Sequence, residues 1–160
     1  EWKKKINIFK ELFTNIDKFI NGKKKAICLG SRTGQEVVAL QKLGVEDSIG
    51  IDLHEFKPYT IVGDIHKLDF ADNTFDLAFS NIFDHSLYPE KFAAETYRVL
   101  QKGGIFILHV QLGIDQDAYT EVIIENKDSI VELFKDFKLV QDGPINSGII
   151  AMNYEFVFEK

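Results

Sequence analysis

Apolar residues near the start of the chain recur with the spacing of one helix face. They stand alternately four and three positions apart and comprise Trp2, Ile6, Phe9, Phe13, Ile16 and Ile20. This pattern predicts an amphipathic helix over residues 1–22, which Asn21-Gly22 ends. Such a helix usually covers a sheet. The alternatives are that it closes over a ligand, or that it docks on a partner or on a second copy of the chain.

Short apolar runs and helical segments alternate through the middle of the chain. The runs predict strands over residues 26–29, 48–52, 59–62, 75–80 and 105–110. Helical spacing predicts helices over residues 35–43, from Pro89 to a stop at Gly103-Gly104, and over 118–134 with a break near 126–128. Near-continuous apolar strands that alternate with helices are typical of a parallel sheet covered on both faces.

The tail has the pattern of two further strands. They are predicted over residues 138–141 and 149–158, joined by a turn at Asp142-Gly143-Pro144, and the second alternates apolar with polar or small residues. We therefore expect a single α/β domain over residues 1–160. Its sheet has seven strands, mostly parallel with an antiparallel C-terminal edge strand, and helices on both faces.

Composition narrows the class of protein. The chain has 160 residues, 45% hydrophobic and 28% charged, which is enough for one domain with its own core. Its longest uncharged apolar runs, such as residues 105–108, fall far short of the ~20 residues of a membrane span. The net charge of -6 argues against a nucleic-acid partner. The one cysteine, Cys28, has no internal disulfide partner, so a reducing, cytoplasmic location is the simplest interpretation.

Candidate chemistry lies just after the strands, because open parallel sheets bind ligands at the carboxyl ends of their strands. A glycine-bearing turn, Gly30-Ser31-Arg32-Thr33-Gly34, follows the first strand. It lets the backbone approach a ligand closely. Arg32 and Gln35 occupy the positions where the dinucleotide fingerprint has glycines, which disfavours NAD and FAD. No Gly-Lys-Ser/Thr follows the turn, so a P-loop is excluded.

An acid closes the second strand. Asp52 follows Gly30 at roughly the 20-residue distance at which a carboxylate reaches ribose hydroxyls. A carboxylate can accept hydrogen bonds from both hydroxyls of a vicinal diol. Together with Gly30 and Gly34, Asp52 predicts a nucleoside-binding site; as a lone residue it would equally suit a turn.

An ordered set of motifs gives this pattern a family resemblance. The set runs from about Lys25 to Val110 and comprises Cys28-Leu-Gly-Ser-Arg-Thr-Gly34, Gly50-Ile-Asp52-Leu, Gly63-Asp64, Leu68-Asp-Phe-Ala-Asp72, Phe75-Asp76 and Tyr97-Arg-Val-Leu-Gln-Lys-Gly-Gly104. It resembles the class I S-adenosylmethionine-dependent methyltransferases, in particular their small-molecule, type 11-like branch. The resemblance implies a Rossmann-like fold and S-adenosyl-L-methionine as the cofactor.

The resemblance also implies residue roles. Gly30, Ser31 and Gly34 resemble the turn around the methionine part of the cofactor. Asp52, followed by Leu53, is similar to the acid on the ribose. The remaining cofactor positions are Asp64 with Ile65 beside adenine, and Ser80 with Asn81 below the reactive sulfonium.

Two residues depart from the family pattern. The family usually has an acid at the position of Cys28 and a glycine at that of Arg32. The missing acid removes an anchor near the methionine amino group. Arg32 could instead pair with the methionine carboxylate, because a guanidinium matches that group bidentately; the alternative is an arginine that points to solvent.

The four histidines, at positions 54, 66, 85 and 109, lack the spacing of a metal helix, and we expect no metal site. His85 is the candidate general base, since histidine titrates near neutral pH. Packing over the cofactor is the alternative role for His85. Asn81 is the second catalytic candidate.

Three functions follow from these residues. The first is methyl transfer to an acceptor that the sequence does not identify, either a small molecule or a protein side chain. The second is a catalytically degenerate cofactor-binding module, regulatory or structural, of a larger protein or complex. The third, a nucleotide-binding oxidoreductase domain, is opposed by the glycine spacing. The segments expected to shape the acceptor pocket are residues 83–88, 111–119 and 146–148.

Overall fold

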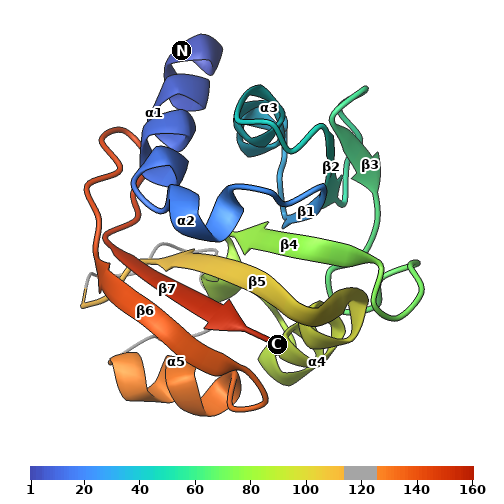
Figure 1. The fold of residues 1–160 in the computed structure, drawn as a ribbon, viewed down its shortest axis with the longest axis vertical. Helices are drawn as coiled ribbons and strands as arrows, with labels where there is room; N and C mark the ends of the chain where they lie inside the picture. Colours follow the sequence, from blue (N-terminus) through green and yellow to red (C-terminus); the bar gives the residue numbers. More distant parts are fainter. Residues whose placement is uncertain (114–125) are drawn as a thin grey trace.

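The computed structural model describes residues 1–113 and 126–160, and the strands of these residues form one sheet. The strand order is β3-β2-β1-β4-β5-β7-β6 (Figure 1). All neighbouring pairs from β3 to β5 are parallel, and β7 is antiparallel to both β5 and β6. The strands are β1 (Lys25–Leu29), β2 (Asp47–Asp52), β3 (Thr60–Val62), β4 (Phe75–Ser80), β5 (Leu100–Val110), β6 (Lys138–Pro144) and β7 (Tyr154–Glu159).

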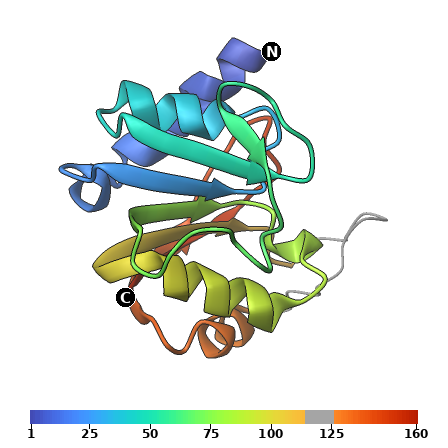
Figure 2. The same cartoon turned by 90° about the vertical axis from the view of Figure 1, so that its right-hand side faces the viewer.

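Helices cover both faces of the sheet, which confirms the predicted α/β class (Figures 1 and 2). One face carries α1 (Trp2–Thr14), α2 (Asp17–Ile20) and α3 (Gln35–Lys42). The opposite face carries α4 (Pro89–Val99) and α5 (Lys127–Leu133). A 3-10 turn, η1 (Phe83–His85), follows β4. The sheet is therefore the middle of three layers.

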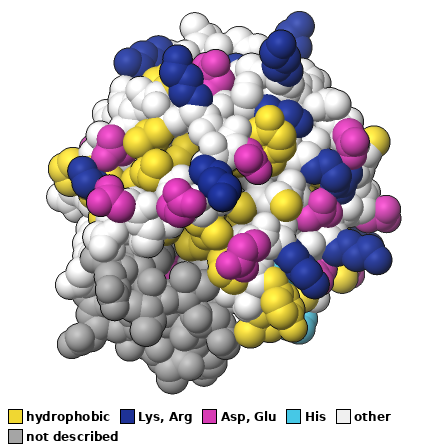
Figure 3. Space-filling model, turned by 90° about the horizontal axis from the view of Figure 1, so that it is seen from below, with side chains coloured by type: hydrophobic (Ala, Val, Ile, Leu, Met, Phe, Trp, Pro, Cys, Tyr) yellow, Lys and Arg dark blue, Asp and Glu magenta, His cyan; other side chains and the backbone are white. Residues whose placement is uncertain are grey.

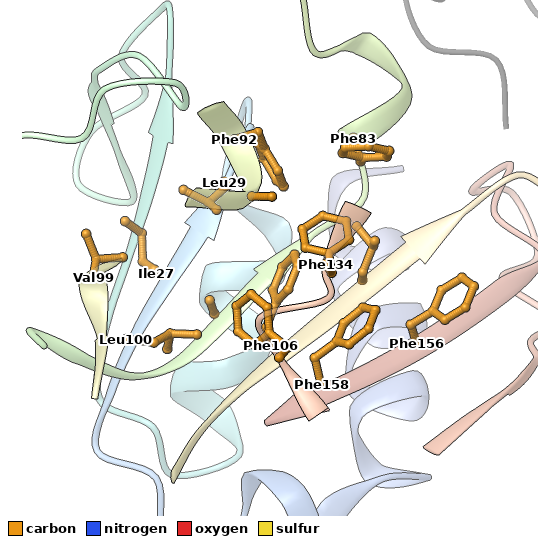
Figure 4. Close-up of a cluster of buried hydrophobic side chains, with 14 of the residues drawn as sticks. Ile27, Leu29, Phe83, Phe92, Val99, Leu100, Phe106, Phe134, Phe156 and Phe158 are labelled. Atoms are coloured by element: carbon orange, nitrogen blue, oxygen red, sulfur yellow. The ribbon is translucent and has the colours of Figure 1, made fainter. Parts of the chain in front are cut away.

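The two faces of the sheet are filled by different side chains. Phenylalanines dominate the face under α4 and α5, where Phe106 of β5 lies at the centre of the group shown in Figure 4. The Phe134 and Phe158 rings have centroids 5.4 and 6.1 Å from that of Phe106. The face under α1 and α3 is mainly aliphatic. Most of the fourteen phenylalanines thus serve as core volume, as expected.

The apolar stripe of the N-terminal segment is buried against the sheet and α3. Phe9 and Phe13 both contact Phe79 of β4, with centroid distances of 5.8 and 5.1 Å. The segment therefore covers the sheet, which was the first of its three predicted roles. The single helix predicted over residues 1–22 is broken, because Ile16 leaves helical geometry between α1 and α2. The break turns the chain while both Ile16 and Ile20 stay buried.

The bounds of several predicted elements differ from those in the structure. The last strand begins at Tyr154, not at residue 149, because the 147–153 segment forms a turn around the Ser147 hydroxyl, to which the Met152 amide donates a hydrogen bond. The turn predicted at residues 142–144 belongs to β6. The helix predicted to end at Gly103-Gly104 ends at Val99, and both glycines lie in β5. Of the helix predicted over 118–134, residues 118–125 lie outside the described part, and α5 begins at Lys127.

At the amino end of the sheet, charged groups bind to the protein itself. The Asp76 carboxylate accepts hydrogen bonds from the amides of Lys24 and Lys25. The Arg98 guanidinium donates to the carbonyls of residues 68 and 70 and to the carboxylates of Glu95 and Asp72. This network ties α4 to the loop before β4.

The face of the molecule that α4 and α5 form has mixed charge. On the face in Figure 3, described Lys and Arg side chains lie among Asp and Glu side chains over α4 and α5. Within the described ranges, 1–113 and 126–160, no helix has the length and apolar character needed to cross a membrane.

Candidate functional site

A cavity of about 370 Å³ lies beyond the carboxyl ends of β1 to β4. We call it the strand-end pocket. Its volume falls in the usual range for small-molecule sites, about 300–1,000 Å³. Residues that follow β1, β2, β3 and β4 line it: Gly30, Arg32, Asp52, Leu53, Gly63, Asp64, Ile65, His66, Ile82, His85, Leu87 and Tyr88.

The sheet topology explains why the pocket forms there. From β1 the chain moves outward to β2 and β3, and then returns to place β4 on the other side of β1. The connections after β1 and β4 therefore leave the sheet in opposite directions, and a crevice opens between them. Figure 2 shows the parallel strands running toward one side of the molecule.

The turn after β1 brings backbone to the pocket wall. The amides of Gly30 and Ser31 both donate to the Ile51 carbonyl, which holds the turn against β2. Gly30 has φ 76, and a Cβ built there would lie 2.0 Å from Cγ1 of Ile82. Only glycine fits at this position, both for its dihedral angle and for the space that Ile82 occupies.

The other predicted residues of this turn have different surroundings. Ser31 is buried, and its hydroxyl pairs with that of Thr60 at 2.8 Å, outside the pocket lining. Gly34 is the N-cap of α3 with φ 82, and its Cα faces Tyr59. Arg32 lines the pocket with an exposed side chain and has φ 48, which costs a non-glycine residue free energy.

Asp52 stands at the end of β2 with its carboxylate fixed by backbone donors. The Arg32 amide donates to Oδ2 at 2.9 Å, and the Leu53 amide donates to Oδ1 at 2.7 Å. Each carboxylate oxygen keeps a further lone pair for a ligand. Leu53 lies beside it with 73% of its surface exposed and supplies an apolar side chain to the pocket lining.

Asp64 follows β3 and is bound by the neighbouring histidine. Its Oδ1 accepts hydrogen bonds from the backbone amide and from Nδ1 of His66, both at 2.8 Å. These bonds, the backbone one first, hold the pKa of the Asp64 carboxyl below its ordinary value. Asp64 is thus an anion with one oxygen, Oδ2, that has no hydrogen bond from the described residues.

Residues after β4 form the opposite wall and the rim. Ile82 and the exposed side chains of Leu87 and Tyr88 make this side apolar. His85 is 38% exposed, lines the pocket, and has its Nε2 3.7 Å from Oδ2 of Asp84. A half-exposed imidazole beside a buried carboxylate has the chemistry of a general base.

Ser80 and Asn81 do not line the pocket. Ser80 is fully buried, and its hydroxyl donates to the Leu29 carbonyl and accepts from the Ile82 amide. This pair of bonds ties the end of β1 to the chain leaving β4. Asn81 is half-buried between that tie and η1.

A buried carboxyl group lies beneath the turn. Glu36, in the first turn of α3, is 4% exposed, and burial raises its pKa to about 8. Burial also raises the pKa of the Cys28 thiol, with a smaller contribution from Glu36. Cys28 is therefore a neutral thiol, and it cannot supply the negative charge that the family usually has there.

A protein-family profile matches the region that builds this pocket. The family is described as "Methyltransferase domain", and the match covers residues 27–108, slightly more than half of the chain. The chain belongs to this family. Membership confirms the resemblance, and at the level of the family it confirms the expected cofactor, S-adenosylmethionine. No curated protein matches the sequence of this methyltransferase domain.

Solved structures share the fold at low identity. An Archaeoglobus fulgidus structure titled as a SAM-dependent methyltransferase has a TM-score of 0.73 at 11% identity, covering 97% of this chain and 94% of its own. The Burkholderia thailandensis 1,6-didemethyltoxoflavin-N1-methyltransferase, solved with its substrate and S-adenosylhomocysteine, has a TM-score of 0.75 at 14% identity, covering 96% and 76%. A structure titled as the complex between the Haloferax volcanii Trm112 methyltransferase activator and the putative methyltransferase has a TM-score of 0.67 at 16% identity, covering 92% and 88%.

Sequence reasoning missed two kinds of residue in the methyltransferase domain. His66 was considered only as a metal ligand, whereas in the structure it binds Asp64 and lines the pocket. Its place two residues after Asp64 was the available signal. Ile82 and Glu36 gave no signal, because their importance depends on packing. Among the described residues, no three His, Cys, Asp or Glu side chains converge as metal ligands do.

Proposed function

We propose that the strand-end pocket binds S-adenosylmethionine and that the chain transfers its methyl group to a small-molecule acceptor. The supporting observation is that two carboxylates, Asp52 and Asp64, line one pocket from the ends of adjacent strands, with Gly30 between them and β4. A nucleoside needs such an arrangement, with one acid for the ribose diol and one for the exocyclic amine. A protein side chain is the second class of acceptor.

The pocket fits the adenosine part of this cofactor. Asp52 would accept hydrogen bonds from the ribose hydroxyls through its free lone pairs. Oδ2 of Asp64 would accept one from the adenine amine, with Ile65 against the ring. Ile82 and Leu53 supply apolar surface, which removes water from the ligand. Ser31, Gly34 and Ser80 support the walls rather than touching the ligand.

Catalysis in this pocket would rest mainly on positioning. The bound cofactor supplies a methyl group on a positively charged sulfur. Leu87 and Tyr88 exclude water on the rim side, where the acceptor enters. His85, exposed on that side, is the proposed base that removes the acceptor's proton. Asn81, half-buried between Ser80 and η1, remains the second catalytic candidate.

Calorimetric titration with S-adenosylhomocysteine tests the cofactor site. Asp52→Ala should weaken binding about 30-fold or more, because both ribose hydroxyls lose a charged acceptor. Asp52→Asn keeps one acceptor oxygen and should weaken binding less. Asp47→Ala is the matched control: Asp47 is exposed at the opposite end of the same strand and should leave affinity unchanged. NAD should not bind.

Failure of the folded wild-type chain to bind either S-adenosylmethionine or S-adenosylhomocysteine would refute the proposal.

A catalytically degenerate module is the second candidate function. The observation that favours it is the neutral, buried thiol of Cys28 in place of an acid. Tight cofactor binding with no turnover of any acceptor in a substrate screen would favour that candidate.

The free, buried state of Cys28 also suits our proposal of a reducing, cytoplasmic location.

A further inference from the structure

His66 connects two walls of the strand-end pocket. Its Nδ1 lies 2.8 Å from Oδ1 of Asp64, on the wall that follows β3. Its Nε2 lies 2.7 Å from the Ser86 hydroxyl and accepts a hydrogen bond from the Tyr88 amide at 3.3 Å, on the rim that follows β4. One imidazole thus bridges segments that are twenty residues apart in sequence.

The partners of His66 determine which ring nitrogen carries the proton. A backbone amide can only donate, so Nε2 has the lone pair and accepts from Tyr88. The Ser86 hydroxyl then also donates to Nε2. The hydrogen must be on Nδ1, where it faces the Asp64 carboxylate. Every polar atom of the ring is therefore used, and the ring orientation is fixed.

The same residue types in the same order form hydrolytic triads. Here, however, Ser86 is fully buried and does not line the pocket, so its oxygen is closed to a substrate. The ring of Tyr88 packs edge-on against His66 at a centroid distance of 5.5 Å. Nζ of Lys91, in α4, lies over the Tyr88 ring, 4.8 Å from its centroid. These contacts belong to a structural tie.

We propose that His66 is a positioning residue that couples the adenine side of the pocket to its acceptor side. By occupying Oδ1 of Asp64 twice, His66 leaves Oδ2 as the oxygen for the ligand amine. By binding the Tyr88 amide and the Ser86 hydroxyl, it holds residues 86–88 in register with that carboxylate. Cofactor binding at Asp64 should therefore stabilise the rim where the acceptor enters. This inference rests on the proposed function.

Two substitutions separate the two halves of the tie. An asparagine side chain can place its amide at the position of Nδ1, and a glutamine side chain can reach the position of Nε2. His66→Asn should therefore keep the bond to Asp64 and lose the bonds to Ser86 and Tyr88. His66→Gln should keep an acceptor for Tyr88 and lose the donor to Asp64.

The readouts are S-adenosylhomocysteine affinity by calorimetry and exchange of the Tyr88 amide hydrogen by NMR. In the wild type, ligand should slow Tyr88 exchange several-fold. His66→Asn should bind within about 3-fold of wild type but exchange the Tyr88 amide about 10-fold faster, with no slowing by ligand. His66→Gln should show the opposite pattern: affinity lowered about 10-fold and the Tyr88 amide still protected.

Equal effects of the two substitutions on both readouts, or no effect of either, would overturn the inference, because a merely structural histidine gives no opposite patterns. Should His66→Asn fail to fold, Ser86→Ala tests the same half, with faster Tyr88 exchange expected at unchanged affinity. A fluorophosphonate probe that labelled Ser86 would also overturn it. If wild type binds no ligand, the proposed function fails, while faster Tyr88 exchange in free His66→Asn still supports the tie.

Discussion

Charged side chains at the two ends of the sheet differ in their hydrogen-bond partners. At the amino end, Asp76 and Arg98 use their hydrogen-bonding groups on backbone amides, carbonyls and neighbouring side chains. At the carboxyl end, Asp52 and Asp64 line a pocket, with lone pairs left over. Glu36 is buried nearby, and this burial raises the pKa of its carboxyl group.

This difference separates stability from ligand binding along one sheet. Polar groups that are satisfied within the protein stabilise it, whereas groups held ready for a ligand cost stability until the ligand arrives. The amino end should therefore respond to substitution in unfolding experiments. The carboxyl end should respond mainly in binding, and some of its variants should even be more stable than wild type.

The largest expected effect concerns Glu36. Because its folded pKa is raised from 4.5 to about 8, the folded state holds a proton that the unfolded state loses between those values. Stability should therefore fall as pH rises from 4.5 to 8. Glu36→Gln, always neutral, should lack this loss and should gain about 3 kcal/mol relative to wild type between pH 5 and pH 8.

Urea unfolding of both proteins at several pH values measures this difference. Glu46→Gln, at an exposed position four residues after the end of α3, should give a curve parallel to wild type and serves as the control. If stability changed with pH in the same way for Glu36→Gln and wild type, Glu36 would be ionised in the folded protein. That result would contradict the proposed contrast between the two ends of the sheet.

The second effect is at the amino end. Arg98→Met keeps the aliphatic stem but removes donors to Glu95, Asp72 and two carbonyls, and should lower the free energy of unfolding by about 2 kcal/mol. Lys135→Met is the matched control. It breaks an i,i+3 pair with Glu132 in which both side chains are at least 70% exposed, and should cost at most about 0.5 kcal/mol. Cofactor affinity should stay unchanged in both variants. A large loss of affinity in Arg98→Met would contradict the assignment of stability to the amino end of the sheet and of binding to the carboxyl end.

The smallest effect is at Arg32, whose φ of 48 is strained for a side chain with a Cβ. Arg32→Gly should relieve that strain and raise stability by up to about 1 kcal/mol, less the added freedom of the unfolded chain. Asn73→Gly, at the other non-glycine residue with positive φ among those described, should gain less, because asparagine tolerates this conformation.

Arg32 also tests the predicted pairing with the methionine carboxylate. If the guanidinium makes that contact, Arg32→Gly and Arg32→Ala should both weaken S-adenosylmethionine binding several-fold, although only the glycine variant gains stability. Unchanged affinity in both would establish that the side chain points to solvent.

The sequence predicted the class of fold because its strands are nearly continuous apolar runs. Such runs place β1, β2 and β4 within one residue of their observed bounds and β5 at its correct end, although β5 begins at Leu100 and not at residue 105. It predicted the ligand edge because parallel strands present their carboxyl ends together. Asp52, Asp64 and Gly30 were found in this way.

The directions in which side chains point, and the residues against which they pack, could not be predicted from the sequence. Ser31 and Ser80 stand at strand ends, as expected, but their hydroxyls turn into the protein and find partners 29 and 51 residues away in the chain. The role of His66 depends on Ser86 in the same manner. The start of β7 was predicted too early because alternation of apolar residues continues through a segment that the Ser147 turn removes from the sheet.

The placement of β7 between β5 and β6 has a consequence for how the chain folds. In the sheet of the described residues, β6 is joined only to β7, so it has no strand to pair with when it emerges from the ribosome. Both strands must dock together, once residues 154–159 have been made. Until then the edge of β5 is open, and the Phe106 face beneath it is incompletely covered. The interval between synthesis of β5 and β7 is therefore the time at which a nascent chain of this protein most needs protection from aggregation.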